Sequence, residues 1–171
     1  AMTTFRGLLR MHTHGSMNPA RIARAINRLL PEFTGDAHFI TAIYLSVDLS
    51  GGDFTYVCCG HQPPLHVDRE SGVRSLDVHG PALGIFPRVN YPSETLPLAA
   101  GELLALYTDG VVEVSDAQGV AYGAERLKAA LSRGRGMTAA ALVQEVIKDT
   151  LAFLGSPGYE DDFTLVIIKR L

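Results

Sequence analysis

Cysteine is scarce in this chain of 171 residues, and no apolar run reaches the length of a membrane-spanning helix. A spanning helix needs about 20 apolar residues, so no membrane segment is predicted. The start of the chain has no apolar segment typical of a secretory signal, and Ala1-Met2 is interpreted as a cloning remnant. Lysine and arginine form no cluster along the sequence, and the formal net charge is -3. Neither nucleic acid nor a membrane is therefore expected as a partner.

The two cysteines, Cys58 and Cys59, are adjacent within an apolar stretch. Neighbouring side chains on a strand point to opposite faces, which argues against a disulfide between them. No histidines at suitable spacing accompany them, so a zinc site is not expected either. Buried, reduced thiols are predicted, and reduced thiols are typical of a cytoplasmic protein.

The composition is that of a folded globular protein. Hydrophobic residues make up 47% and charged residues 19% of the chain, and the length suits one domain with its own core. The chain has no repeat, low-complexity tract or linker. Residues 1–171 are therefore predicted to form a single domain.

The first third of the chain predicts two helices and a hairpin. A short helix is expected around Leu8, and a second over 19–30, which begins after the cap Asn18 and stops at Pro31. Residues 39–47 are largely apolar on both faces of a strand, which predicts burial on both sides. Residues 54–59 should return as the hairpin partner after a glycine-containing turn.

The remainder predicts further strands, two helices and a closing strand. Four prolines make 79–98 irregular, with short extended pieces. The expected strands are 65–68, 73–78, 102–108 and 163–168, and the expected helices are 123–132 and 138–154. Strands followed by a helical pair indicate an α+β fold with mainly antiparallel sheets and flanking helices.

Acidic residues stand beside two of the predicted buried strands. Asp109 follows strand 102–108 and precedes Gly110, while Asp161 and Asp162 precede strand 163–168. Carboxylates at strand ends are held firmly and can reach a cation, and Mg²⁺ or Mn²⁺ prefers such oxygen ligands. Local chemistry equally allows an ordinary turn at Asp109 and a solvated loop at Asp161, and spacing alone does not show that the two sites meet.

Five sequence blocks resemble one known family. Residues 106–113 read Leu-Tyr-Thr-Asp-Gly-Val-Val-Glu, and residues 161–166 read Asp-Asp-Phe-Thr-Leu-Val. Upstream, residues 39–42, 60–64 and 83–85 read Phe-Ile-Thr-Ala, Gly-His-Gln-Pro-Pro and Leu-Gly-Ile. In this order the blocks are similar to those of the PPM-type serine/threonine protein phosphatases of the SpoIIE/RsbU kind.

The resemblance implies an αββα sandwich with a two-metal centre, holding Mn²⁺ or Mg²⁺, that activates a water for in-line attack on a phosphoserine. Asp109 and Asp161 would be the metal ligands and hence the catalytic residues. Four further residues would support the site: Thr108, Gly110, Asp162 and His61. For His61 two roles stay open, because it can hold its loop by hydrogen bonds or act as a catalytic acid.

The family also implies a substrate and leaves a second function open. The expected reaction is dephosphorylation of phosphoserine or phosphothreonine on a regulatory protein, such as an anti-anti-sigma factor of the STAS type in bacterial signalling. The alternative is a non-catalytic pseudophosphatase or truncated binding and dimerisation module with the same fold.

This sequence departs from the family pattern at its start. The family has a bridging aspartate in an early strand, followed by a Gly-His-Gly block, and neither is present in this chain. The domain is therefore expected to be incomplete at its N-terminus and to bind divalent metal weakly. Missing strands would leave a sheet edge near 39–47 exposed, and such an edge predicts a homodimer.

Several arginines precede or lie in the second helix. Arg6, Arg10, Arg21 and Arg24 could contact phosphate. Such residues more often cover a solvated helix face, and no site is predicted from them.

Overall fold

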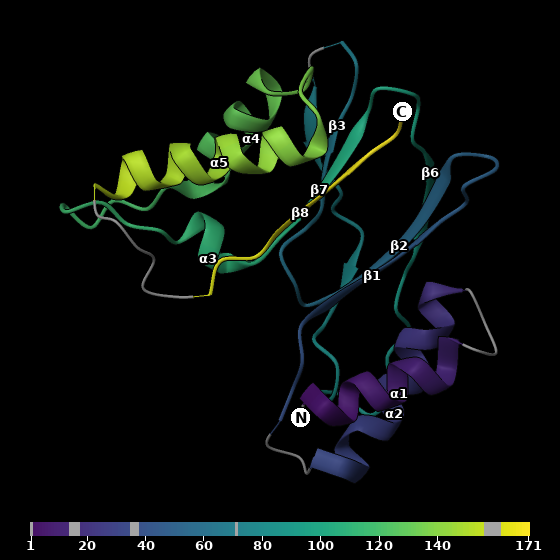
Figure 1. Cartoon of the computed structure of the whole chain (residues 1–171). Coiled ribbons are helices and arrows are strands. Elements are labelled where there is room, and N and C mark those ends of the chain that lie inside the picture. The colour runs from purple at the N-terminus through teal and green to yellow at the C-terminus, as the bar shows by residue number, and fades with distance from the viewer. Residues whose placement is uncertain (1, 14–17, 35–37, 71, 156–161) are drawn as a thin grey trace. The chain divides into compact units, whose positions relative to one another are not determined.

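The computed structural model describes residues 2–13, 18–34, 38–70, 72–155 and 162–171 (Figure 1). The chain forms two compact units, one from residues 1–63 with 77–97 and the other from 64–76 with 98–171. The single domain predicted for the whole chain stays a prediction. No helix within the described ranges is long and apolar enough to cross a bilayer.

The first unit begins with two helices that pack against each other, α1 (Met2–Thr13) and α2 (Pro19–Thr34). The predicted cap is present, since Oδ1 of Asn18 accepts a hydrogen bond from the backbone N–H of Arg21 at 3.0 Å. The predicted stop at Pro31 is wrong, because α2 continues through it to Thr34. Proline has a helical φ and removes only one backbone donor, so a helix with a well-packed face can pass it.

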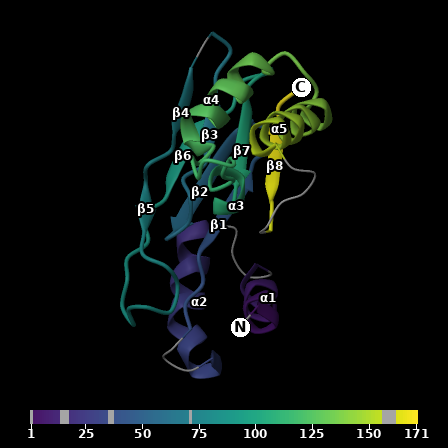
Figure 2. The same cartoon turned by 90° about the vertical axis from the view of Figure 1, so that its left-hand side faces the viewer.

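The sheet of the first unit is organised around β2 (Asp53–Cys59). The hairpin partner β1 (Ala42–Val47) pairs antiparallel along one edge of β2. The other edge is shared by β6 (Glu94–Pro97), which pairs antiparallel, and the two-residue strand β5 (His79–Gly80), which pairs parallel. Figure 2 gives a second view of these elements.

Burial on both faces was predicted for residues 39–47, and this is wrong. Every residue of β1 is half-buried, whereas β2 is almost wholly buried. The reason is that β1 is an edge strand, which pairs only with β2 in the part of the chain that the structure describes. A homodimer through this edge stays a prediction.

The core of the first unit lies between its helices and its sheet. Ile22, Ile26 and Leu30 recur along one face of α2 and are at most 2% exposed. They pack with Val57 and Cys59 of β2. One helical layer on one sheet face is therefore the architecture of this unit.

The second unit has four strands, which are β3 (Leu65–Val67), β4 (Val73–Ser75), β7 (Leu103–Tyr107) and β8 (Leu165–Lys169). They form a fully antiparallel sheet in the order β4-β3-β7-β8. Two helices cover it, as Figure 2 shows: α4 (Gly123–Arg133) lies beside β3 and β4, and α5 (Ala139–Leu154) lies beside β8. The capping hydroxyl of Thr138 accepts a hydrogen bond from the N–H of Ala141, which fixes the start of α5.

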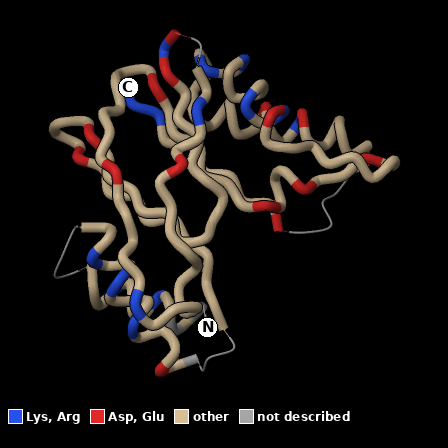
Figure 3. The backbone as a smooth tube through the Cα atoms, turned by 180° about the vertical axis from the view of Figure 1, so that it is seen from behind, with Lys and Arg blue, Asp and Glu red and all other residues tan. Residues whose placement is uncertain are grey.

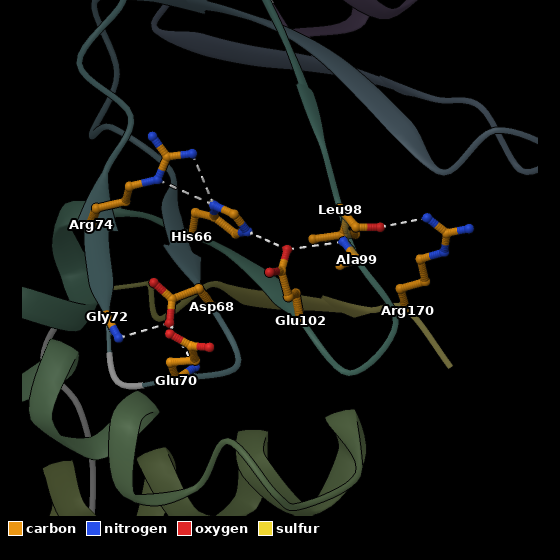
Figure 4. Close-up of polar contacts among 9 residues, drawn as sticks. All are labelled: His66, Asp68, Glu70, Gly72, Arg74, Leu98, Ala99, Glu102 and Arg170. Atoms are coloured by element: carbon orange, nitrogen blue, oxygen red, sulfur yellow. Dashed lines mark hydrogen bonds and ion pairs between the residues drawn. The ribbon is translucent and has the colours of Figure 1, made fainter.

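A polar network that sequence reasoning missed ties three parts of this unit together (Figure 4). The guanidinium of Arg74 donates to Nδ1 of His66, at 3.3 Å from Nε and 3.2 Å from Nη2. Because Nδ1 accepts, Nε2 is the donor toward Glu102, whose Oε2 lies 3.0 Å away. The same carboxylate oxygen accepts from the N–H of Ala99 at 2.9 Å. The network joins β4, β3 and the turn before β7, so we interpret it as structural.

The cysteines are buried free thiols, as predicted. Burial, together with the neighbouring Cys58, raises the pKa of the Cys59 thiol from 9.0 to about 12. Burial also raises the pKa of Cys58, although the carbonyl of His61 accepts its S–H at 3.2 Å. The thiolate is the reactive form, so both groups should resist alkylation in the folded chain.

The raised pKa of Cys59 predicts a loss of stability at alkaline pH. The unfolded thiol ionises from about pH 9, while the folded thiol stays protonated to about pH 12, so unfolding is favoured between these values. The free energy of unfolding should fall by up to about 1.4 kcal/mol per pH unit for this thiol. Urea denaturation at pH 7, 9 and 10 measures it. The Cys59→Ala variant should show a smaller slope, and an equal slope would contradict the assignment.

Candidate metal centre

The antiparallel pairing of β7 and β8 places Asp109, which follows β7, and Asp162, which precedes β8, at the same end of these two strands. Tyr107 pairs with Leu165, so the end of β7 lies beside the start of β8. Beyond the ladder, the backbone N–H of Thr108 donates to the carbonyl of Thr164 at 3.1 Å. The hydroxyl of Thr108 accepts from the N–H of Thr164 at 3.2 Å and lies 3.4 Å from the carbonyl oxygen of Asp162. Thr108 therefore holds the two segments together.

Asp109 opens a one-turn helix, α3 (Asp109–Val112), that the sequence did not predict. Its backbone carbonyl accepts from the N–H of Glu113 at 2.8 Å, and its Oδ1 accepts from the N–H of Gly110 at 3.0 Å. The side chain is exposed. The ordinary turn considered for this position is thus a short helix, in which the carboxylate is oriented at the sheet edge and open to solvent.

Gly110 is buried directly against the Asp162 segment. A Cβ atom at this position would lie 2.3 Å from the carbonyl oxygen of Asp162 and 3.1 Å from its carbonyl carbon. Non-bonded atoms do not approach so closely, so only glycine allows the two backbones to meet in this way. Packing thus requires a glycine after Asp109, in addition to the metal-binding role that the sequence predicts for this aspartate.

The other predicted ligand, Asp161, lies outside the described residues. Asp162 is described and exposed. Within the described residues no group of three histidine, cysteine, aspartate or glutamate side chains could hold a metal ion. The exposed carboxylates of Asp109 and Asp162 flank one sheet edge and have the oxygen chemistry that Mg²⁺ and Mn²⁺ prefer. The residues thus fit part of such a site.

His61 belongs to the first unit, in the loop after β2. Its Nδ1 lies 3.2 Å from the hydroxyl of Thr41, and its carbonyl accepts the thiol of Cys58. The preceding Gly60 has φ +65°, and a Cβ there would lie 2.6 Å from the backbone nitrogen of Ala82. These contacts favour the loop-holding role, while the supporting role in the site stays a prediction.

Three side chains that follow α3 in the sequence contact α5. The hydroxyl of the buried Tyr122 donates to Asp149 of α5, and Arg133 donates to the same carboxylate at 3.2 Å. Arg126 lies over the ring of Phe153, 4.4 Å from its centroid. The contacts of Tyr122 and Arg126 show how the segment after α3 is anchored to α5.

Comparison with solved structures identifies the class of fold. The SiaA PP2C domain of Pseudomonas aeruginosa superposes with a TM-score of 0.84 at 19% identity, covering 96% of this chain and 67% of that chain. The Mn-presoaked phosphatase domain of Bacillus subtilis SpoIIE superposes with a TM-score of 0.66 at 19% identity, covering 97% and 73%. The predicted α+β class with mainly antiparallel sheets is confirmed, and the fold is that of PP2C-like phosphatase domains.

The sequence comparison identifies the family. The family described as Stage II sporulation protein E (SpoIIE) matches residues 1–171, and the chain belongs to this family. The RsbU and RsbW domains of Rv1364c from Mycobacterium tuberculosis superpose with a TM-score of 0.75 at 26% identity, covering 99% of this chain and 46% of that chain.

Curated relatives carry phosphatase names. Phosphoserine phosphatase RsbU of Bacillus subtilis is 26% identical over 155 residues, which are 90% of this chain and 46% of that protein. Phosphoserine phosphatase RsbP of the same organism is 32% identical over 101 residues, which are 57% and 25%. Protein IcfG of Synechocystis is 28% identical over 149 residues, which are 86% and 23%. The chain thus spans less than half the length of these relatives.

Proposed function

We propose that the protein is a metal-dependent phosphatase that removes phosphate from phosphoserine or phosphothreonine on a regulatory protein. The observation that carries the proposal is the exposed Asp109 carboxylate beside the Asp162 segment, held there by Thr108 and Gly110. The family and the relatives named as phosphoserine phosphatases support the reaction.

The residues of this chain would position the reaction rather than form a covalent intermediate. Asp109 and Asp161 would hold the cation, while Thr108 and Gly110 keep their two segments in contact. Bound Mn²⁺ or Mg²⁺ would supply an activated water and neutralise charge on the transferring phosphoryl group. Asp162 would help to orient the ligand that precedes it.

The substrate we propose is a phosphorylated anti-anti-sigma factor of the STAS type, in a cytoplasmic pathway that regulates a sigma factor. Support comes from the resemblance to RsbU and RsbP and from the buried, reduced thiols. The second candidate is a binding module without catalysis. It is supported by the departure of this sequence from the family pattern, since the Gly-His-Gly block is not present in this chain.

Phosphate release separates these two candidates. The full-length protein is mixed with a serine-phosphorylated STAS-domain protein, with and without Mn²⁺. We expect release that requires Mn²⁺ and stops when EDTA is added. A full-length protein that binds this substrate without releasing phosphate would establish the binding module instead.

The 171-residue chain by itself should bind Mn²⁺ weakly. Two carboxylates leave most of the coordination sphere of a divalent cation to water, and a hydrated cation is easily lost. We expect calorimetric titration with Mn²⁺ to give a dissociation constant of roughly a millimolar or weaker. Tight binding of two ions would show instead that this chain supplies a complete ligand set.

A further inference from the structure

The first unit carries an open, arginine-lined pocket that sequence reasoning did not predict. It has a volume of about 500 Å³ and lies between α2 and residues 87–90. Figure 3 shows basic positions gathered over the helices of this unit. The residues that line the pocket include four arginines, Arg21, Arg24, Arg28 and Arg88.

Three of these arginines share one face of α2. Arg21, Arg24 and Arg28 stand at positions i, i+3 and i+7, and all three are exposed. At 1.5 Å per residue they extend over about 10 Å of helix. That length exceeds a single phosphate group and is close to three residues of an extended peptide, at about 3.3 Å each.

A buried amide fixes the loop that forms the other wall. Asn27 is 2% exposed, and its Nδ2 donates to the carbonyl of Phe86 at 2.8 Å. Its Oδ1 accepts from the N–H of Gly84 and from the hydroxyl of Tyr91, each at 2.9 Å. The loop is therefore clamped to α2 on both sides of Arg88, so the backbone that carries Arg88 is fixed opposite the helix before any ligand arrives. A preformed wall lowers the entropy cost of binding.

The pocket has an excess of positive charge. Among the described residues, no aspartate or glutamate lines it. Across the described ranges, none of the four arginines takes part in an ion pair, and Arg24 instead donates to the side-chain oxygen of Asn90 at 3.2 Å. Guanidinium groups match carboxylates with two parallel hydrogen bonds, and uncompensated positive charge favours an anionic ligand.

We propose that this pocket binds an acidic, extended segment of a partner protein, with carboxylates at alternate residues. Alternate side chains of an extended peptide lie on one side, about 7 Å apart, so two carboxylates fit within the roughly 10 Å of α2 that the three arginines cover. Two large apolar side chains, Ile85 and Phe86, directly precede Pro87 of the pocket and are 48% and 54% exposed. They are suited to apolar residues that alternate with the carboxylates. This inference does not depend on the metal centre.

Fluorescence anisotropy tests the proposal with a labelled peptide of alternating glutamate and leucine, seven residues long. A second peptide has glutamine at each glutamate. We expect the acidic peptide to bind in low salt and to weaken as salt is added, and the glutamine peptide to bind at least tenfold more weakly. Failure of the acidic peptide to bind, or equal binding of both, would overturn the proposal.

Variants locate the binding. Arg24→Glu and the milder Arg24→Gln should each weaken the acidic peptide, with Arg24→Glu losing tenfold or more. The matched control is Arg135→Glu, an exposed arginine of the second unit, which should leave the affinity unchanged. Thermal melts confirm that each variant is folded. An equal loss of affinity in the control, or no loss in either Arg24 variant, would contradict the site. If inorganic phosphate displaced the acidic peptide at the concentration at which the peptide itself binds, the pocket would be a simple phosphate site instead.

Discussion

Replacing Asp109 by asparagine is expected to reduce Mn²⁺-dependent phosphoserine turnover roughly a hundredfold or more, in a form of the protein that has the activity. Asparagine keeps the volume and one acceptor for the N–H of Gly110, but it removes the charge that holds the cation. The fold should survive because the side chain is exposed. Without metal, the melting temperature should stay the same or rise slightly, because neighbouring carboxylates repel each other.

The matched control for this substitution is Asp53→Asn. Asp53 is an exposed aspartate at the start of β2, in the first unit, and has no role in the proposed site. Its variant should retain near-normal turnover at every Mn²⁺ concentration. If Asp109→Asn behaved like Asp53→Asn, Asp109 would be an ordinary residue at the start of a helix, and the proposed metal centre would lose its main support.

Gly110→Ala should damage both stability and activity. The added Cβ would meet the backbone of Asp162 at 2.3 Å, and backbone cannot move aside as a flexible side chain can. Overpacking of this kind costs about 1–3 kcal/mol of unfolding free energy. The displaced segment includes the neighbour of Asp161, so turnover should fall by roughly tenfold to a hundredfold.

Gly136→Ala is the control for this second substitution. Gly136 is in the same unit and has no atom within 4 Å of the position where a Cβ would be added. Urea denaturation and phosphate release are measured for both variants. We expect Gly136→Ala to match the parent protein in both measurements. A Gly110→Ala variant with unchanged stability would mean that the α3 turn and the Asp162 segment are further apart than the structure indicates.

Most elements of the fold could be predicted from periodicity and turn residues, and the errors have physical causes. The hairpin of β1 and β2 and the helices α4 and α5 were predicted, because alternation and apolar spacing are local signals. The partial exposure of β1 was not predicted, because Ile43 and Leu45 look like core residues in the sequence, whereas their strand lies at a sheet edge. Position within a sheet depends on pairing with distant residues, which one sequence does not reveal.

The candidate site was predictable only in part. Asp109 was found because it follows a buried strand and matches a family motif, but α3 and the contact between Gly110 and Asp162 require the β7–β8 pairing. The arginine pocket was missed for a similar reason. Arg88 is 60 positions or more from Arg21, Arg24 and Arg28, and only the clamp around Asn27 places them together.

The two compact units are interleaved along the chain, and this affects how the molecule can be divided and synthesised. The first unit needs residues 77–97, which follow the first hairpin of the second unit at 64–76. No single cut therefore separates them, and an isolated unit would require joining two distant pieces. During synthesis the local hairpins β1–β2 and β3–β4 can pair early, whereas the other edge of β3 must wait for β7, which pairs in turn with β8 at the end of the chain. Stalled or shortened chains should therefore expose the unpaired edge of β3 and depend on chaperones.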